Sequence, residues 1–247
     1  HSSDDALNAA ALKRIGYSLN AGYAYNVKYG SVSNFFDMEI FNGDIVDMNE
    51  FDRRLTTLSA FISALEKKKN SLEYIETAPK ILMSSECVKQ HYGITIEEIK
   101  RLQRWILSSC EDKYFNAHSL WNSIQDEPII QKLQNNEWMC TCILRQQEGI
   151  YSLSVAGGII LAKDSTALSL SKLCEWIVEK KGKMTVQNLT NAVNEIFNTN
   201  IPYYKIAEKL KSGGNWKNCV TDSFDDYIDT LMIDTEEEAD LLQEEFF

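Results

Sequence analysis

Apolar residues recur at intervals of three and four through residues 93–220, and the same helical pattern occurs there twice. Such spacing gathers side chains on one face of a helix, which can then pack against a core. The matching apolar positions are Leu102, Trp105 and Ile106 in the first copy and Leu173, Trp176 and Ile177 in the second. Each copy contains three expected helices separated by short polar turns. That order is typical of helix-turn-helix proteins.

The first copy continues into residues that favour strands. Three expected helices, 96–106, 115–124 and 129–138, are followed by the apolar, β-leaning runs Met139–Leu144, Ile150–Ala156 and Gly158–Ala162. Three helices followed by a β-hairpin is the winged-helix order. In that fold the third helix enters the major groove and the hairpin tip lies on the DNA backbone. We therefore expect residues 129–138 to form a recognition helix and Arg145 to lie on the wing.

The second copy has clear helix boundaries. Ser169 or Ser171 starts its first helix, Thr185 caps the second, Val186–Phe197, and Ile201-Pro202 opens the third, Tyr203–Lys211. The hydroxyl side chain of a serine or threonine before a helix accepts a hydrogen bond from one of the first free backbone N–H groups of that helix. The third helix is also rich in lysine, and we expect it to contact phosphate.

The N-terminal region combines an aromatic segment with a long expected helix. Tyr23, Tyr25, Val27 and Tyr29 alternate with small or polar residues, which is the period of a strand. With the following apolar residues up to Phe41, they favour an aromatic core under a short sheet over a base-stacking surface. Residues Asn49–Lys69 carry an apolar stripe at heptad spacing and predict one continuous helix. Its basic end, Lys67–Lys69, fits a solvated helix terminus better than a phosphate contact.

Together these patterns predict a mainly α fold with small β-hairpins. We expect tandem winged-helix-like domains at 93–167 and 168–220. A helical region with an aromatic arm precedes them at 1–92, and an acidic amphipathic tail follows at 221–247.

The net charge of −11 is concentrated at one end of the chain. Residues 93–220 hold 15 basic and 13 acidic residues, whereas residues 221–247 hold 11 acidic residues and no basic one. The repeats are therefore slightly basic, which permits phosphate contacts. Apolar residues spaced through the acidic tail favour an amphipathic helix that docks on this protein or on a partner.

No set of residues indicates catalysis. The six cysteines lack the spacing of a disulfide framework and are expected to be reduced and mostly buried. Cys140 and Cys142, with His118, lack the second ligand pair that a zinc site needs. Gly-rich phosphate loops are absent too. We expect a cytoplasmic protein without enzymatic activity, cofactor, metal or membrane span.

Two stretches resemble known families. Residues 71–93 (SLEYIETAPKILMSSECVKQHYG) and 115–144 resemble helical C-terminal regions of sigma-factor-like regulators of low-GC bacteria. The second copy, TVQNLTNAVNEIF and IPYYKIAEKLK with an acidic tail beyond, is similar to the HARE-type winged helix of the RNA polymerase delta subunit. The resemblance implies a winged-helix module that works in transcription, on DNA or through RNA polymerase. Neither expected recognition helix contains arginine, the residue that most often reads guanine.

The leading hypothesis is a DNA-binding or transcription-associated protein. Its expected nucleic-acid contacts are Gln131, Lys132, Gln134, Asn135, Arg145, Tyr203, Lys205, Lys209 and Lys211. In an alternative, the winged helices are scaffolds, and the acidic tail or the aromatic arm binds a partner protein. Because the sequence begins at His1 rather than Met, a non-catalytic fragment of a larger enzyme is a second alternative.

Overall fold

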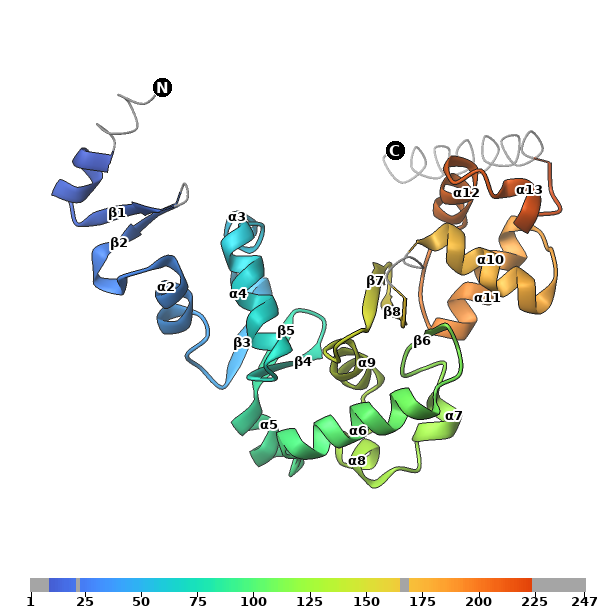
Figure 1. The fold of residues 1–247 in the computed structure, drawn as a ribbon, viewed down its shortest axis with the longest axis horizontal. Coiled ribbons are helices and arrows are strands. Elements are labelled where there is room, and N and C mark those ends of the chain that lie inside the picture. Colours follow the sequence, from blue (N-terminus) through green and yellow to red (C-terminus); the bar gives the residue numbers. More distant parts are fainter. Residues whose placement is uncertain (1–8, 21–22, 165–168, 224–247) are drawn as a thin grey trace, which may run out of the picture. The chain divides into compact units, whose positions relative to one another are not determined.

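The computed structural model describes residues 9–20, 23–164 and 169–223, and the chain divides into two compact units (Figure 1). The first unit takes residues up to 109 together with 125–147, and the second takes 110–124 together with 148 onward. Both units combine helices with small antiparallel sheets, as the sequence predicts. The division differs from the predicted domains, because residues 110–124 and 148–164 belong to the unit that holds the second copy.

The first unit begins with helical residues 9–14 and a short hairpin. Strand β1 (Tyr17–Asn20) pairs antiparallel with β2 (Tyr23–Asn26), and the 3-10 helix η1 (Val27–Tyr29) follows. Helix α2 (Val32–Glu39) begins at Ser31, whose side chain accepts a hydrogen bond from the N–H of Asn34. The aromatic alternation therefore marks a strand only up to Asn26.

A three-stranded antiparallel sheet lies at the centre of the N-terminal core. Its order is β3 (Ile45–Asp47), β5 (Ile81–Ser84) and β4 (Tyr74–Ala78). The core beside this sheet is largely aromatic and contains Phe36, Phe41, Phe61, Tyr74 and Leu82. Of the aromatic residues of segment 23–41 that were predicted to form this core, Phe36 and Phe41 are confirmed in it.

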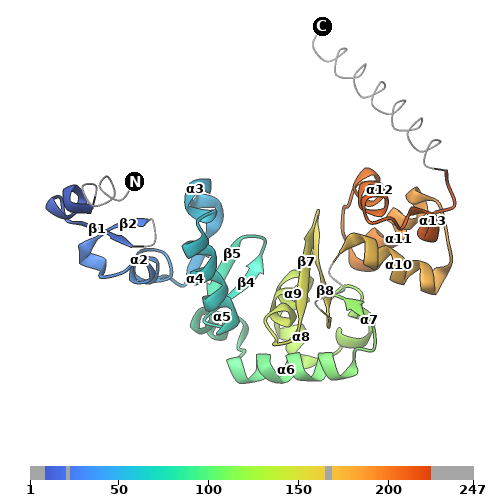
Figure 2. The ribbon, with the colours of Figure 1, turned by 45° about the horizontal axis from the view of Figure 1, so that its top comes forward.

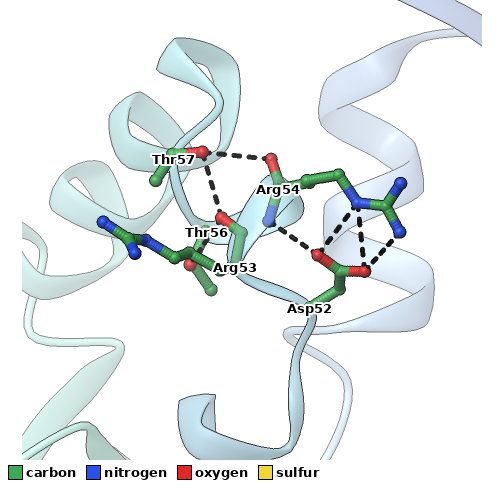
Figure 3. A network of polar contacts seen from close by, with 5 residues as sticks. All are labelled: Asp52, Arg53, Arg54, Thr56 and Thr57. Carbon is green, nitrogen blue, oxygen red and sulfur yellow. Dashed lines mark hydrogen bonds and ion pairs between the residues drawn. The ribbon is translucent and has the colours of Figure 1, made fainter.

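The prediction of one continuous helix from 49 to 69 is wrong. The segment divides into η2 (Met48–Glu50), α3 (Arg53–Thr56) and α4 (Ser59–Asn70). Figure 3 shows the local cause: the Asp52 carboxylate accepts from the N–H of Arg54 at 2.8 Å, and the Thr57 hydroxyl donates to the carbonyl of Arg53 at 3.0 Å. Side chain to backbone bonds of this kind offer the chain an alternative to continuing a helix.

The basic end of α4 is not a solvated terminus. Lys69 is 3% exposed, and its Nζ lies 3.0 Å from Oε2 of Glu76, which is also buried. Lys68 Nζ contacts carboxylate oxygens of Glu73 at 2.6 Å and Asp37 at 3.0 Å. These two lysines therefore hold α4 to its own unit.

Four further helices complete the first unit, namely α5 (Ser85–Tyr92), α6 (Ile96–Ser109), α8 (Pro128–Lys132) and α9 (Glu137–Arg145). Helix α9 packs against β4 and α6, and α8 lies beside α6 (Figure 1, Figure 2). The predicted strand Met139–Leu144 is wrong, because these six residues are the buried turns of α9. A short apolar run fits a buried helix as well as a buried strand, and here a side-chain cap from Asn136 starts the helix.

The second unit packs helices against a three-stranded sheet. The strands are β6 (Tyr114–Phe115), β8 (Gly158–Ala162) and β7 (Tyr151–Val155), in the order β6-β8-β7. The short helix α7 (Trp121–Ile124) follows β6 in the sequence and precedes α8 of the first unit. The helices are α10 (Leu170–Lys181), α11 (Val186–Phe197), α12 (Tyr203–Ser212) and α13 (Trp216–Cys219). The predicted strands near 151–155 and 158–162 and the predicted caps Ser169 and Thr185 are confirmed.

The predicted helix 115–124 is mostly a turn. Asn116 and Ser119 bond to one another's backbone N–H groups, and only the last turn, α7, is helical. The Asn116 side chain also donates to the carbonyls of Phe197 and Ile159. It thereby joins β6 to α11 and β8 inside one core. None of the helices in the described residues is long and apolar enough to cross a membrane.

Candidate nucleic-acid interface

Helix α12 presents a basic face to solvent. Its opposite face, with Ile206, Ala207 and Leu210, is buried in the core of the second unit. The side chains of Lys205 and Lys209 are each about half exposed. Residues three and four apart share a helix face, so burying one stripe of α12 directs these lysines outward.

The carboxylate of Glu208 forms ion pairs with two lysines, Lys205 and Lys209. Oxygens of Glu208 lie 3.3 Å from Lys205 Nζ and 3.5 Å from Lys209 Nζ. The pKa of Glu208 is lowered, first by its hydrogen bond to Lys205 and then by the charges of both lysines. Exposed ion pairs contribute little to stability, so a phosphate can displace Glu208 from these lysines at low cost. Lys211, near the end of the helix, is exposed as well.

The two tyrosines of α12 have different environments. Tyr203 is half-buried and packs against the core, whereas Tyr204 is 46% exposed. Lys205 Nζ lies 5.5 Å from the centre of the Tyr204 ring. The sequence analysis selected Tyr203, but Tyr204 is the tyrosine that shares the exposed face with the lysines.

The four residues expected on the recognition helix of the first copy, Gln131, Lys132, Gln134 and Asn135, do not share a helix face. The predicted recognition helix 129–138 is wrong, because α8 ends at Lys132 and the chain turns through left-handed backbone at Gln134 (φ 55°) and Asn135 (φ 57°). Gln131, Gln134 and Asn135 are exposed. Lys132 donates to the carbonyl of Gly93 and to Glu98, each at 3.2 Å.

Arg145 does not lie on a wing. It belongs to the last turn of α9, and its Nη2 is 3.7 Å from Oε1 of Glu66. The wing prediction placed it on a hairpin because residues 139–144 read as a strand. Its side chain is 24% exposed, which leaves little of it for a ligand.

The β7–β8 hairpin is held against its own unit at its tip. The N–H of Asn200 donates to the carbonyl of Ala156 at 2.8 Å. A Cβ added to Gly157, whose φ is 82°, would come within 2.9 Å of the backbone nitrogen of Asn200. The tip therefore packs on the loop between α11 and α12. The tip of a hairpin that contacts DNA as a wing would instead be exposed.

The sequence analysis missed a second basic surface, on α6. Lys100, Arg101 and Arg104 are exposed there, and no carboxylate in the described part of the chain pairs with them. Trp105, 36% exposed, follows directly. Lys100 and Arg104, and likewise Arg101 and Trp105, are one helical turn apart. The sequence contains this signal, but it lies in the first helix of its copy, whereas DNA contacts are expected in the third.

A groove of about 330 Å³ runs between α6 and α8 beside this surface. Leu102, Trp105, Pro128 and Ile129 give it an apolar floor, and charged residues, Arg101 and Lys132 among them, form its rim. At the rim, the pKa of Glu98 is lowered to about 2, first by the backbone N–H of Thr95 and then by the hydrogen bond from Lys132.

The cysteines take no part in these surfaces. All six are free thiols, and five are buried, as predicted. Burial raises the pKa of Cys140 and of Cys174 to about 12, so both remain protonated at neutral pH. Within the described residues, no three His, Cys, Asp or Glu side chains gather as metal ligands.

Comparisons with protein-family models, curated proteins and solved structures found no match to this chain. The resemblance to sigma-factor-like regulators and to the delta subunit of RNA polymerase therefore stays a prediction.

Proposed function

We propose that this chain is a non-enzymatic nucleic-acid-binding protein that holds the phosphate backbone of duplex DNA on α12. The observation that carries the proposal is the exposed face of that helix, where Lys205 and Lys209 pair with the single carboxylate of Glu208 and Lys211 is also exposed. Lysine acts as a point charge toward phosphate, and phosphate contacts position a protein without reading sequence.

The proposed binding is largely independent of base sequence. Base readout needs arginine or amide side chains aligned in a groove, and the broken helix at Gln134 and Asn135 supplies no such row. Tyr204 beside Lys205 suits a sugar or backbone contact. A place in transcription follows from this proposal only if the bound DNA lies at a promoter.

Replacing two lysines tests this proposal. We expect Lys205→Ala/Lys209→Ala to weaken binding of a labelled 20-base-pair duplex about tenfold or more at low salt and to make the salt dependence shallower. Lys89→Ala is the control, because Lys89 is an exposed lysine on α5 in the other unit. Equal affinity of the double variant and the control would contradict the proposal.

The groove between α6 and α8 favours a second candidate function, the binding of an acidic protein segment. Tryptophan and arginine dominate the energetics of protein interfaces. Here an exposed Trp105 adjoins Arg101 and Arg104, with which no carboxylate of the described residues pairs. The lining carries Glu98 and Glu127 as well as Arg101 and Lys132, so the acidic residues of a bound helix would meet Arg101 and Arg104 while its apolar residues lie on the floor of the groove.

A synthetic peptide of residues 224–247, which holds ten acidic residues, is a probe with the required chemistry. Trp105→Ala should weaken its binding at least about tenfold, and Arg101→Ala should weaken it mostly at low salt. The same peptide with its acidic residues changed to serine is the control. Unchanged affinity of both variants would leave α6 without a role in protein binding.

A further inference from the structure

A tyrosine-lined pocket lies in the N-terminal part of the first unit. It has a volume of about 370 Å³, and the β1–β2 hairpin, η1, α2 and the turn between α3 and α4 surround it. Four tyrosines, Tyr17, Tyr23, Tyr25 and Tyr29, contribute to its wall, with Phe35 and Leu58 among the apolar residues. The volume lies at the lower end of the range for ligand pockets, which suits a ligand no larger than one nucleotide.

Hydrogen bonds fix three of these rings by their hydroxyl ends. Tyr23 Oη lies 2.7 Å from the hydroxyl of Ser59, Tyr25 donates to the carbonyl of Gly30 at 3.3 Å, and Tyr29 donates to Glu39 at 2.7 Å. Lys28 Nζ lies 4.4 Å from the centre of the Tyr29 ring, so a ligand would meet the rings of Tyr17, Tyr23 and Tyr25. A pocket whose walls are fixed in this way loses little entropy when it binds a flat ligand.

The charges around the pocket select an anionic ligand. Lys28 lines it with a side chain that is 61% exposed, and no aspartate or glutamate belongs to the described lining. Glu39 approaches Lys28 at 3.7 Å from outside the lining. A cage for a quaternary ammonium ion works through aromatic faces and a cationic ligand, and a lysine in the wall would repel such a ligand.

Helix α3 contributes Leu55 to the lining of the pocket, and its two arginines, Arg53 and Arg54, do not belong to the described lining. Figure 3 shows the side chains of Arg53 and Arg54 extending to opposite sides of this short helix. Arg54 is held by Asp52 at 2.8 Å, whereas no described carboxylate pairs with Arg53. Lys28 is therefore the cation that the described lining of the pocket supplies.

We propose that this pocket binds a base of single-stranded nucleic acid, which stacks on the tyrosine rings while Lys28 contacts a neighbouring phosphate. Stacking platforms with flanking cations are how single strands are bound without sequence readout, because every base has a π-face. The site is separate from α12. A chain with both surfaces would hold duplex DNA on one unit and an unpaired base on the other.

The test uses a labelled oligonucleotide of twelve thymidines, the full chain, and substitutions at Tyr17. This residue is 38% exposed, and its replacement removes no hydrogen bond that the structure shows. Tyr17→Ala should weaken binding about 5- to 150-fold, the range for loss of one stacked base. Tyr17→Phe keeps the ring and should bind like the wild-type chain. Thermal unfolding of both variants checks that the hairpin substitution leaves the fold intact.

A second arm separates the base from the phosphates. An abasic oligonucleotide of equal length and charge should bind the wild-type chain as weakly as the thymidine strand binds Tyr17→Ala. Cross-linking of 5-iodouracil in the strand should label the hairpin tyrosines, which gives a readout that does not depend on any substitution.

Three results would overturn the proposal: equal affinity for abasic and thymidine strands, equal loss in Tyr17→Phe and Tyr17→Ala, or binding of a proline-rich peptide with none of the oligonucleotide. The proposed duplex site can fail independently. Lys205→Ala/Lys209→Ala should leave the stacking difference between Tyr17→Ala and Tyr17→Phe unchanged, and Tyr17→Ala should leave duplex affinity unchanged.

Discussion

Lys69 and Glu76 form a buried ion pair in the first unit. Both residues are buried, with exposures of 3% and 8%, and their charged atoms are 3.0 Å apart. Glu76 also accepts from the N–H of Lys80 at 3.2 Å. Charges removed from water in this way are tolerated only when they remain paired.

We therefore predict that Lys69→Met lowers the free energy of unfolding by about 3–5 kcal/mol, because the Glu76 carboxylate would stay buried without its partner. The double variant Lys69→Met/Glu76→Leu should recover most of that loss. Urea denaturation of the two variants measures both values. A double variant as unstable as the single one would show that the pair is not the source of the cost.

Glu98 links stability to pH. Its folded-state pKa of about 2 lies below the ordinary value of 4.5, because the N–H of Thr95 and then Lys132 bond its charged form. A lowered carboxyl pKa stabilises the fold at pH above 4.5, and this contribution is lost as the pH falls from about 4.5 toward 2.

The difference in thermal midpoint between the wild-type chain and Glu98→Gln should therefore be largest at pH 6 and should shrink as the pH approaches 2. Glu97→Gln is the control, because Glu97 is an exposed neighbour in the same helix turn. A difference that stays constant from pH 6 to pH 2 would contradict the assignment.

At the scale of elements, helix starts were predictable where a single side chain makes the cap. Thr95 and Glu98 bond one another's backbone N–H groups at the start of α6, and Ser169 and Thr185 cap α10 and α11. These are local interactions, so the sequence contains the whole signal. The second copy was predicted well for this reason.

Breaks inside apolar stretches were not predictable in the same way. Residues 139–144 are apolar in either secondary structure, and their burial against β4 and α6 together with the Asn136 cap selects the helix. The break after Lys132 depends on left-handed backbone at Gln134 and Asn135, and Gln rarely adopts it. Tertiary contacts also decide that Arg145 faces Glu66.

Asn116 tests how strongly β6 belongs to the second unit. Its amide donates to the carbonyl of Phe197 at 2.8 Å and to that of Ile159 at 3.3 Å, and the side chain is buried. We predict that Asn116→Ala lowers the stability of this unit by about 1–3 kcal/mol, because two buried carbonyls lose a donor. Asn122→Ala, at an exposed position in α7, is the control. Equal denaturation midpoints for the two variants would refute the role of Asn116.

For the whole molecule, the chain enters the second unit twice. Tyr114, Ile160 and Ala162 come from β6 and β8, yet all three lie in the core formed with α10 to α13. Helical periodicity could not reveal this, because it reports which residues are buried and not which segments they are buried against.

A fragment of residues 168–223, close to the predicted second domain, should therefore unfold at a lower temperature and less cooperatively than a fragment that also contains 110–164. The shorter fragment leaves the apolar residues that face Tyr114 and Ile160 exposed to water. Circular dichroism during heating compares them. A sharp transition of equal midpoint in the shorter fragment would restore the predicted boundary at 167/168.

In the candidate sites too, features set by local sequence were predictable, and features set by tertiary contacts were not. The exposure of Lys205 and Lys209 follows from the helical stripe of α12, which the sequence displays. Lys132 and Arg145 are engaged by Glu98 and Glu66, and no spacing rule predicts those partners.

The salt dependence of duplex DNA binding by the wild-type chain tests the proposed function most directly. If Lys205, Lys209 and Lys211 each neutralise one phosphate, the logarithm of the affinity should fall with the logarithm of salt concentration with a slope of about −2.7. Fluorescence anisotropy of a labelled duplex between 50 and 200 mM salt measures that slope. Absence of binding at 50 mM, or an affinity that does not change with salt, would contradict a phosphate-binding role for α12.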